Sequence, residues 1–241
     1  MPGMDIKIGE NQFDSYLSLP ESGRGPGLII MASVYGVDDD ARAMADSFAT
    51  KGFPVSVPDL FWRGDKGGLT RSETDKARAK ARGADRAVLI ENGVGDLAEV
   101  MADLKARPEC NGRIAVLGLC YGGPYAILGP ARLGCDAGIS FHGTQVQNYL
   151  DPVDKVTVPL SLHWGDKDHA APPEALDRIR AAIAGMENAE LIIYPGVEHG
   201  YSGPAAGDAY DVPATEASMA RTLEILEGLR AEGETMAGAA Q

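Results

Sequence analysis

Residues 113–123 read RIAVLGLCYGG, an apolar run that leads into a cysteine with glycines on both sides. The run RIAVLGL is short, rich in branched residues and bounded by a charge and a glycine, which predicts a buried parallel strand. The stretch PYAILGPARLG that follows at 124–134 predicts an apolar helix. Cys120 therefore stands at a strand-to-helix turn, the nucleophile elbow, where Gly118 and Gly122 leave room for a strained backbone.

Similar apolar runs recur on both sides of this turn. Further strands are expected at 27–33, 53–60, 137–143, 158–165 and 189–196, and DIKIG and FDSYLSLP near the start predict an antiparallel hairpin at the sheet edge. Helical patterns lie between them, at 38–52, 72–91, 94–107, 173–185 and 214–233. This alternation predicts an α/β protein with a mostly parallel central sheet and helices on both faces. Together with the elbow at Cys120, it indicates the α/β-hydrolase fold.

One helical pattern is interrupted by Gly93-Val94-Gly95. The motif lacks the third glycine of a dinucleotide-binding fingerprint and follows a helix rather than a strand. We therefore expect a helix break at this point and no nucleotide site.

Composition narrows the class of protein. The 241 residues, 44% of them hydrophobic, predict one domain over 1–241 with a flexible tail from about residue 233. The formal charge of −13 disfavours nucleic acid and anionic membrane surfaces as partners. No apolar stretch suits a signal peptide or a membrane span, so a soluble cytoplasmic protein is expected, as a monomer or dimer. Three cysteines without CxxC spacing favour free thiols over disulfides or a zinc site.

A thiol needs a base and an orienting carboxylate, which α/β hydrolases supply later in the chain in the order acid, then histidine. Asp168 follows the strand predicted at 158–165, and His199 follows the one at 189–196. Both lie at the carboxyl ends of strands, where open α/β sheets place their sites. His163 is expected to be a hydrogen-bonded core residue, and His142, at the end of a strand, is a candidate for the border of the pocket.

The oxyanion hole and the pocket walls are harder to recognise in the sequence than the candidate nucleophile, acid and base. We expect the backbone N–H groups of Tyr121 and of about Val34 to stabilise an oxyanion. Ser33, Tyr35 and Tyr201 are candidate substrate contacts at the strand-end side. No metal ion and no cofactor is expected.

The chain resembles the dienelactone hydrolase family, also called carboxymethylenebutenolidases. The matching motifs are VYGVDDDARAMADSFATKGFPVSVPDLFWR at 34–63, ENGVGDL at 91–97, GLCYGG at 118–123, GDKDHAAP at 165–172 and EHGY at 198–201. The resemblance implies that Cys120 is the nucleophile, Asp168 the acid and His199 the base. It also implies hydrolysis of dienelactone to maleylacetate without metal or cofactor, in the catabolism of aromatic compounds.

Two positions depart from the family pattern. Ser33 stands where the family usually has a glutamate that holds the resting thiol. The family binds the substrate carboxylate with two arginines: Arg78 matches the first, whereas Gly203 occupies the place of the second. Arg78 would supply the local cation that an anionic substrate needs in a protein of negative charge.

Three functions stay open from the sequence. The first is opening of dienelactone or a related small anionic lactone. The second, prompted by Ser33 and Gly203, is a general carboxylesterase or thioesterase acting on small neutral acyl groups. The third is a non-catalytic binding or redox-sensing protein in which Cys120 is reversibly oxidised.

Overall fold

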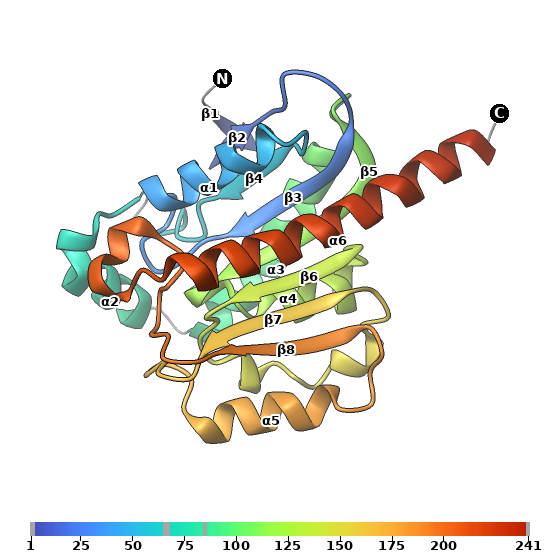
Figure 1. Ribbon diagram of the computed structural model, residues 1–241. Coiled ribbons are helices and arrows are strands. Elements are labelled where there is room, and N and C mark those ends of the chain that lie inside the picture. Colours follow the sequence, from blue (N-terminus) through green and yellow to red (C-terminus); the bar gives the residue numbers. More distant parts are fainter. Residues whose placement is uncertain (1–2, 65–67, 84–85, 240–241) are drawn as a thin grey trace. The chain divides into compact units, whose positions relative to one another are not determined.

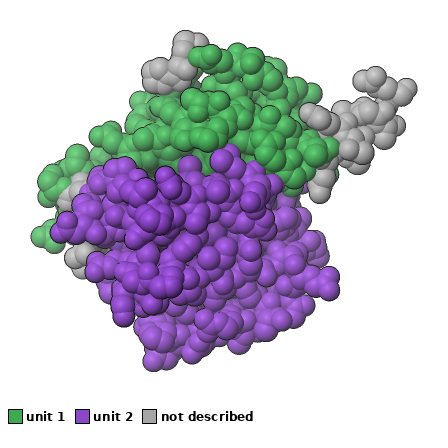
Figure 2. All heavy atoms as spheres, viewed as in Figure 1, with its two compact units in different colours: residues 1–115, 226–241 green, residues 116–225 purple. Residues whose placement is uncertain are grey.

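The computed structural model describes residues 3–64, 68–83 and 86–239, without the side chains at 71, 78, 80–83 and 232–239. The chain divides into two compact units, which Figure 2 colours separately. Unit 1 comprises Met1–Ala115 and Leu226–Gln241, and unit 2 comprises Val116–Ile225. The single domain expected over 1–241 stays a prediction.

Unit 1 contains the N-terminal hairpin and the first parallel strand pair. Its strands are β1 (Met4–Ile8), β2 (Phe13–Ser18), β3 (Gly25–Met31) and β4 (Val55–Pro58), in the sheet order β1-β2-β4-β3. β2 pairs with β1 and β4 in antiparallel fashion, whereas β3 and β4 are parallel. Its helices are α1 (Asp39–Ala49), α2 (Thr74–Gly83) and α3 (Arg86–Lys105), with a 3-10 turn at Arg71–Glu73. The predicted edge hairpin is thus confirmed.

Unit 2 begins within β5 (Cys110–Leu119) and adds three strands in the order β5-β6-β7-β8. These are β6 (Ala137–Phe141), β7 (Leu160–Gly165) and β8 (Ala189–Tyr194), with β6, β7 and β8 parallel. The helices are α4 (Tyr125–Leu128), α5 (Pro173–Ile183) and the first part of α6 (Val212–Ala239). Figure 1 shows α5 running beside β8. The predicted α/β class is confirmed.

The side chains of β7 point alternately to the two faces of the unit 2 sheet, and both faces are covered. Leu160, Leu162 and Trp164 pack in one apolar cluster with Ile179 and Ile183 of α5. The intervening side chains point to the opposite face; there Ser161 bonds Glu190, which in turn binds Arg221 of α6. A strand buried on both faces by helices is what its near-continuous apolar sequence indicates.

Three helical expectations differ from the structure. α3 passes through Gly93–Gly95 without interruption, so the helix break expected there is wrong. Each glycine costs about 1 kcal/mol relative to alanine in a helix, but packing outweighs this cost because several side chains of α3 are fully buried: Ile90, Leu97, Val100 and Leu104. The helix expected at 124–134 is the short α4 followed by a π-helical turn at Gly129–Leu133, where Pro130 lacks an N–H donor.

The last helix is longer than its sequence pattern indicates, since α6 runs to Ala239 rather than to 233. The flexibility expected of the tail stays a prediction. None of the helices in the described part of the chain combines the length and apolar character that crossing a membrane requires.

Candidate active site

Cys120 sits on a strained turn directly after β5. β5 ends at Leu119, and a 3-10 turn over Cys120–Gly122 leads into α4. The backbone φ of Cys120 is +49°, in the left-handed region that non-glycine residues rarely adopt. Such strain persists only where the surroundings enforce it, and it exposes the side chain at the apex of the turn. The predicted nucleophile elbow is therefore present in its expected geometry.

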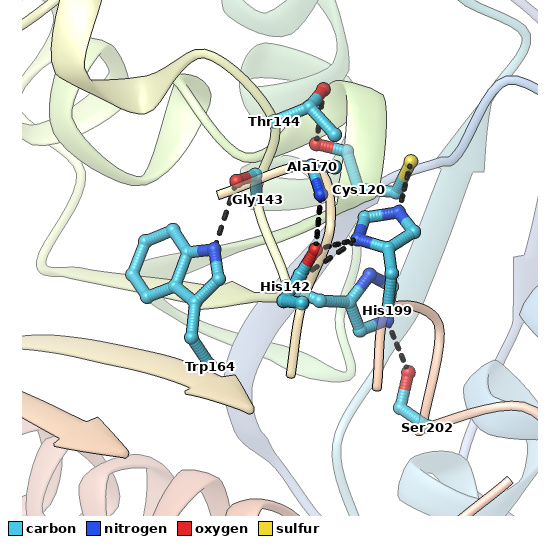
Figure 3. Close-up of polar contacts among 9 residues, drawn as sticks. Cys120, His142, Gly143, Thr144, Trp164, Ala170, His199 and Ser202 are labelled. Atoms are coloured by element: carbon cyan, nitrogen blue, oxygen red, sulfur yellow. Dashed lines mark hydrogen bonds and ion pairs between the residues drawn. The ribbon is translucent and has the colours of Figure 1, made fainter. Parts of the chain in front are cut away.

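Close backbone packing explains the glycines of this turn. A Cβ atom on Gly118 would lie 2.2 Å from the carbonyl oxygen of Gly122, and one on Gly123 would lie 2.5 Å from Cα of Gly143. The loop after β6 also fixes the elbow, because the backbone N–H of Thr144 donates to the carbonyl oxygen of Cys120 at 2.8 Å. Figure 3 shows the Thr144 hydroxyl directed at the same oxygen, at 3.3 Å. No sequence pattern indicated this role for Thr144.

The structure brings Cys120, Asp168 and His199 together within unit 2. Nε2 of His199 lies 3.2 Å from Sγ of Cys120, a contact drawn in Figure 3. Nδ1 of His199 lies 2.9 Å from each carboxylate oxygen of Asp168. The Asp168 side chain is fully buried, and its Oδ1 also accepts the backbone N–H of Ala170 at 2.8 Å. This line of hydrogen bonds can orient the imidazole and hold it against the sulfur.

Electrostatics of the three groups favour a charged pair. Burial lowers the pKa of His199, but the charge of Cys120 and hydrogen bonds to Asp168 and Cys120 outweigh burial and raise the pKa to about 10. The imidazole therefore keeps its proton at neutral pH, and its positive charge favours the thiolate form of the adjacent sulfur. A thiolate is the nucleophilic form of cysteine, so the arrangement can attack an electrophilic carbonyl without prior deprotonation.

His142 lies next to His199, and the sequence alone indicates no specific role for it in the site. Its side chain is buried, its φ is +41°, and its Nε2 lies 2.8 Å from Oγ of Ser202. The ring packs edge-on against the ring of His199, with 5.0 Å between centroids. From its sequence, His142 is expected at the end of a strand, and it directly follows β6. Its partner Ser202 lies sixty positions further along the chain, and no sequence pattern indicated that contact.

Three predicted site residues belong to unit 1, in the loop between β3 and α1. Oγ of Ser33 accepts the backbone N–H of Tyr35 at 3.2 Å, so the hydroxyl closes a local turn. The Tyr35 hydroxyl bonds Oγ1 of Thr74 at 2.9 Å. Val34 is buried. The oxyanion role of Val34 and the substrate contacts of Ser33 and Tyr35 stay predictions.

The remaining predicted residues are placed as follows. Arg78 lies in α2, and its side chain is outside the described part of the structure. Tyr121 follows Cys120 in the elbow and is buried. Tyr201 is fully buried and packs edge-on against the ring of His142, with 5.3 Å between centroids. The roles of these three residues also stay predictions.

Another histidine, His163 of β7, belongs to a buried polar network on one face of the sheet. Its Nε2 bonds Oγ of Ser161 at 2.9 Å, and its Nδ1 bonds the hydroxyl of Tyr194 at 2.8 Å. Burial lowers the pKa of His163 to about 4, although the charge of Glu190 acts in the opposite direction. The expectation that His163 is a hydrogen-bonded core residue is confirmed.

This lowered pKa predicts acid sensitivity of the fold. Below the ordinary pKa of 6.5 the unfolded chain binds a proton at His163, whereas the folded chain does so only near 4. The free energy of unfolding therefore falls as the pH drops through this window, by about 2 kcal/mol between pH 7 and pH 5 from this group. Urea unfolding of wild type and His163→Gln at both pH values measures the difference, because other groups titrate alike. Equal pH dependence in the two proteins would contradict the prediction.

The elbow after β5, the acid loop after β7 and the histidine loop after β8 are the site layout of an α/β hydrolase. The model of the dienelactone hydrolase family matches residues 13–229, and the chain belongs to this family. It is thus a carboxymethylenebutenolidase-like hydrolase, as the sequence motifs indicated.

Individual relatives agree with this assignment. The carboxymethylenebutenolidase of Pseudomonas sp. (strain P51) is 30% identical over 225 residues, covering 93% of this chain and 94% of the relative. Carboxymethylenebutenolidase 1 of Cupriavidus pinatubonensis is 30% identical over 219 residues, covering 91% and 93%. A dienelactone hydrolase-like promiscuous phosphotriesterase from metagenomic libraries shares the fold, with a TM-score of 0.77 at 20% identity over 94% of this chain and 98% of that one.

Proposed function

We propose that the protein opens small anionic lactones, with the conversion of dienelactone to maleylacetate as its reaction. Cys120 is the nucleophile, His199 the proton carrier and Asp168 the carboxylate that orients it. The observation that carries this proposal is the line from Asp168 through His199 to Cys120, with contacts of 2.9 Å and 3.2 Å. Relatives named carboxymethylenebutenolidase at 30% identity support the choice of substrate class.

The first half of the reaction forms an acyl-enzyme. The Cys120 thiolate attacks the lactone carbonyl carbon, and negative charge develops on the carbonyl oxygen. The backbone N–H groups of Tyr121 and Val34 are the proposed donors to that oxygen. The ring C–O bond then breaks, and the leaving enolate oxygen takes the proton from Nε2 of His199, which gives an enol and a neutral imidazole.

The second half releases the acid. The enol tautomerises to a ketone, which removes the hydroxyl group that would otherwise attack the thioester and close the ring again. His199, now neutral, takes a proton from water as the water oxygen attacks the thioester carbonyl. The C–S bond breaks, and the thiolate and imidazolium are restored. Every step uses side chains, backbone N–H groups and water, so the proposal needs neither metal nor cofactor.

The thiolate–imidazolium pair also accounts for the loss of the family's glutamate. A carboxylate at position 33 is not needed to activate the thiol if His199 already holds the proton, as its raised pKa of about 10 indicates. Ser33 instead bonds the backbone of its own turn. We infer that the nucleophile of this protein is activated before substrate binds.

Substrate charge gives a direct test of the proposed substrate class. Arg78→Gln should lower kcat/KM for an anionic dienelactone about 10- to 100-fold, because a charge-assisted hydrogen bond to the carboxylate is lost. Hydrolysis of a neutral aryl ester should change little in the same variant. Initial rates on both substrates measure the effect. Lys76→Gln, an exposed position on the same helix, is the matched control and should alter neither rate.

The alternatives appear as different outcomes of these assays. Cys120-dependent cleavage of neutral esters without lactone opening would support the proposed roles of Cys120, Asp168 and His199. It would, however, indicate a general carboxylesterase or thioesterase in place of a lactone hydrolase. Equal loss on both substrates in Arg78→Gln would contradict a role in binding the carboxylate. No hydrolysis of either substrate would favour the non-catalytic, redox-sensing alternative.

A further inference from the structure

His142 extends the pair Cys120 and His199 into a cluster of three potential metal ligands. One donor atom from each of Cys120, His142 and His199 lies within 4.8 Å of the other two. They come from separate segments of unit 2: the elbow, the end of β6 and the loop after β8. Figure 3 shows the rings of His142 and His199 side by side, with Cys120 at the opposite edge of His199. The proposed hydrolysis uses Cys120 and His199 but has no step for His142.

The surroundings hold His142 as metal-ligating histidines are commonly held. One ring nitrogen, Nε2, bonds the hydroxyl of Ser202 at 2.8 Å. When Nε2 donates its proton to Ser202, the lone pair of the ring lies on Nδ1. A second partner that fixes tautomer and ring orientation is typical of histidine ligands. His142 is only 4% exposed, so packing also fixes its ring. Its backbone lies in the left-handed region, with a φ of +41°.

Donor types and distances suit a borderline or soft divalent ion such as Zn²⁺. One sulfur and two imidazole nitrogens form a common partial ligand set for zinc, with a water in the fourth position. Zinc bonds of about 2.3 Å to sulfur and about 2.0 Å to nitrogen place tetrahedral donors about 3.3–3.6 Å apart. The Cys120–His199 pair already lies at 3.2 Å, and no donor pair exceeds 4.8 Å. Side-chain shifts of about 1 Å would complete the geometry.

We propose that Cys120, His142 and His199 bind one Zn²⁺-like ion, which reversibly blocks the nucleophile. Binding forms one metal–sulfur and two metal–nitrogen bonds and releases to solvent the proton shared by Cys120 and His199. No electron is transferred. The inhibitory consequence rests on the proposed hydrolase function, whereas the binding of the ion does not.

Cobalt substitution tests the site without an activity readout. The chelator-treated full chain is titrated with Co²⁺, which gives a thiolate-to-metal charge-transfer band and, in tetrahedral coordination, strong visible bands. The wild type should bind one equivalent with both signals. His142→Phe should bind at least about 10- to 100-fold more weakly, because one imidazole ligand is lost. His169→Phe is the matched control, since His169 packs 5.4 Å from His199 but is outside the cluster, and it should bind like wild type.

Further arms keep the test decisive. If His142→Phe does not fold, as judged by circular dichroism, Ser202→Ala takes its place and should weaken Co²⁺ binding about 10-fold by freeing the ring. Equal Co²⁺ affinity in wild type and in the folded variant would overturn the proposal, and so would the absence of a thiolate band in wild type. In parallel, Zn²⁺ should inhibit lactone opening reversibly on chelation. A Co²⁺ site in a protein without hydrolysis would refute the proposed function alone.

Discussion

Replacing Cys120 with alanine is expected to lower kcat/KM for lactone opening by about 10⁴-fold or more, because the proposed acyl-enzyme forms on its sulfur. The elbow sets the sulfur at the apex of a strained turn, and Nε2 of His199 lies 3.2 Å from it. Water alone would have to attack the carbonyl in the variant, with help only from the oxyanion donors and substrate binding. Initial rates of ring opening, with substrate in the range of KM, measure this loss.

Cys135→Ala is the matched control for this experiment. Cys135 is a buried thiol of the same unit and lies outside the proposed site. Its variant should open the lactone at nearly the wild-type rate. Lactone opening by Cys120→Ala within about 10-fold of the wild-type rate would remove Cys120 from the mechanism.

Asp168→Asn should lower kcat by about 10³- to 10⁴-fold while preserving the fold. The amide keeps the size of the carboxylate but loses the charge that supports a protonated His199, and it no longer fixes the tautomer of the ring. The carboxylate is fully buried and bonds Nδ1 through both oxygens at 2.9 Å, so its charge acts on the ring with little screening. The thiolate should also be less abundant, and alkylation of Cys120 by iodoacetamide at neutral pH should slow in parallel.

Asp166→Asn provides the control within the same loop. The side chain of Asp166 is exposed, and its Oδ1 accepts the backbone N–H of Gly196 at 2.7 Å, away from His199. Its variant should keep wild-type kcat and alkylation rate. If Asp168→Asn retained more than about a tenth of wild-type kcat, the role of Asp168 as the orienting carboxylate would be refuted.

Much of the fold and the central site could be predicted because both depend on local patterns. Strands buried on both faces read as short apolar runs, and each strand from β3 to β8 has one in the sequence. Glycines mark the elbow in the sequence, because a Cβ atom on Gly118 would clash with the carbonyl oxygen of Gly122. Asp168 and His199 follow strands in the order that α/β hydrolases use, so chain position was enough to pair residues that the structure brings to 2.9 Å.

Other features depend on tertiary packing and could not be predicted. The pair Gly93 and Gly95 looks like a helix break, but the buried face of α3 keeps the helix intact. The environment of His142 arises from Ser202 and Tyr201, which reach it through the fold and not through spacing. Thr144 holds the carbonyl of Cys120 by its backbone N–H, a group that every residue except proline has.

The central claim is that Cys120, as a thiolate, is the nucleophile, and stoichiometric alkylation tests it most directly. The protein is treated with iodoacetamide near neutral pH, the modified cysteine is identified by peptide mass spectrometry, and lactone-opening activity is measured on the same samples. We predict that Cys120 reacts before the buried Cys110 and Cys135 and that activity falls in proportion to its modification. A protein fully alkylated at Cys120 that still opens the lactone at the wild-type rate would contradict the account.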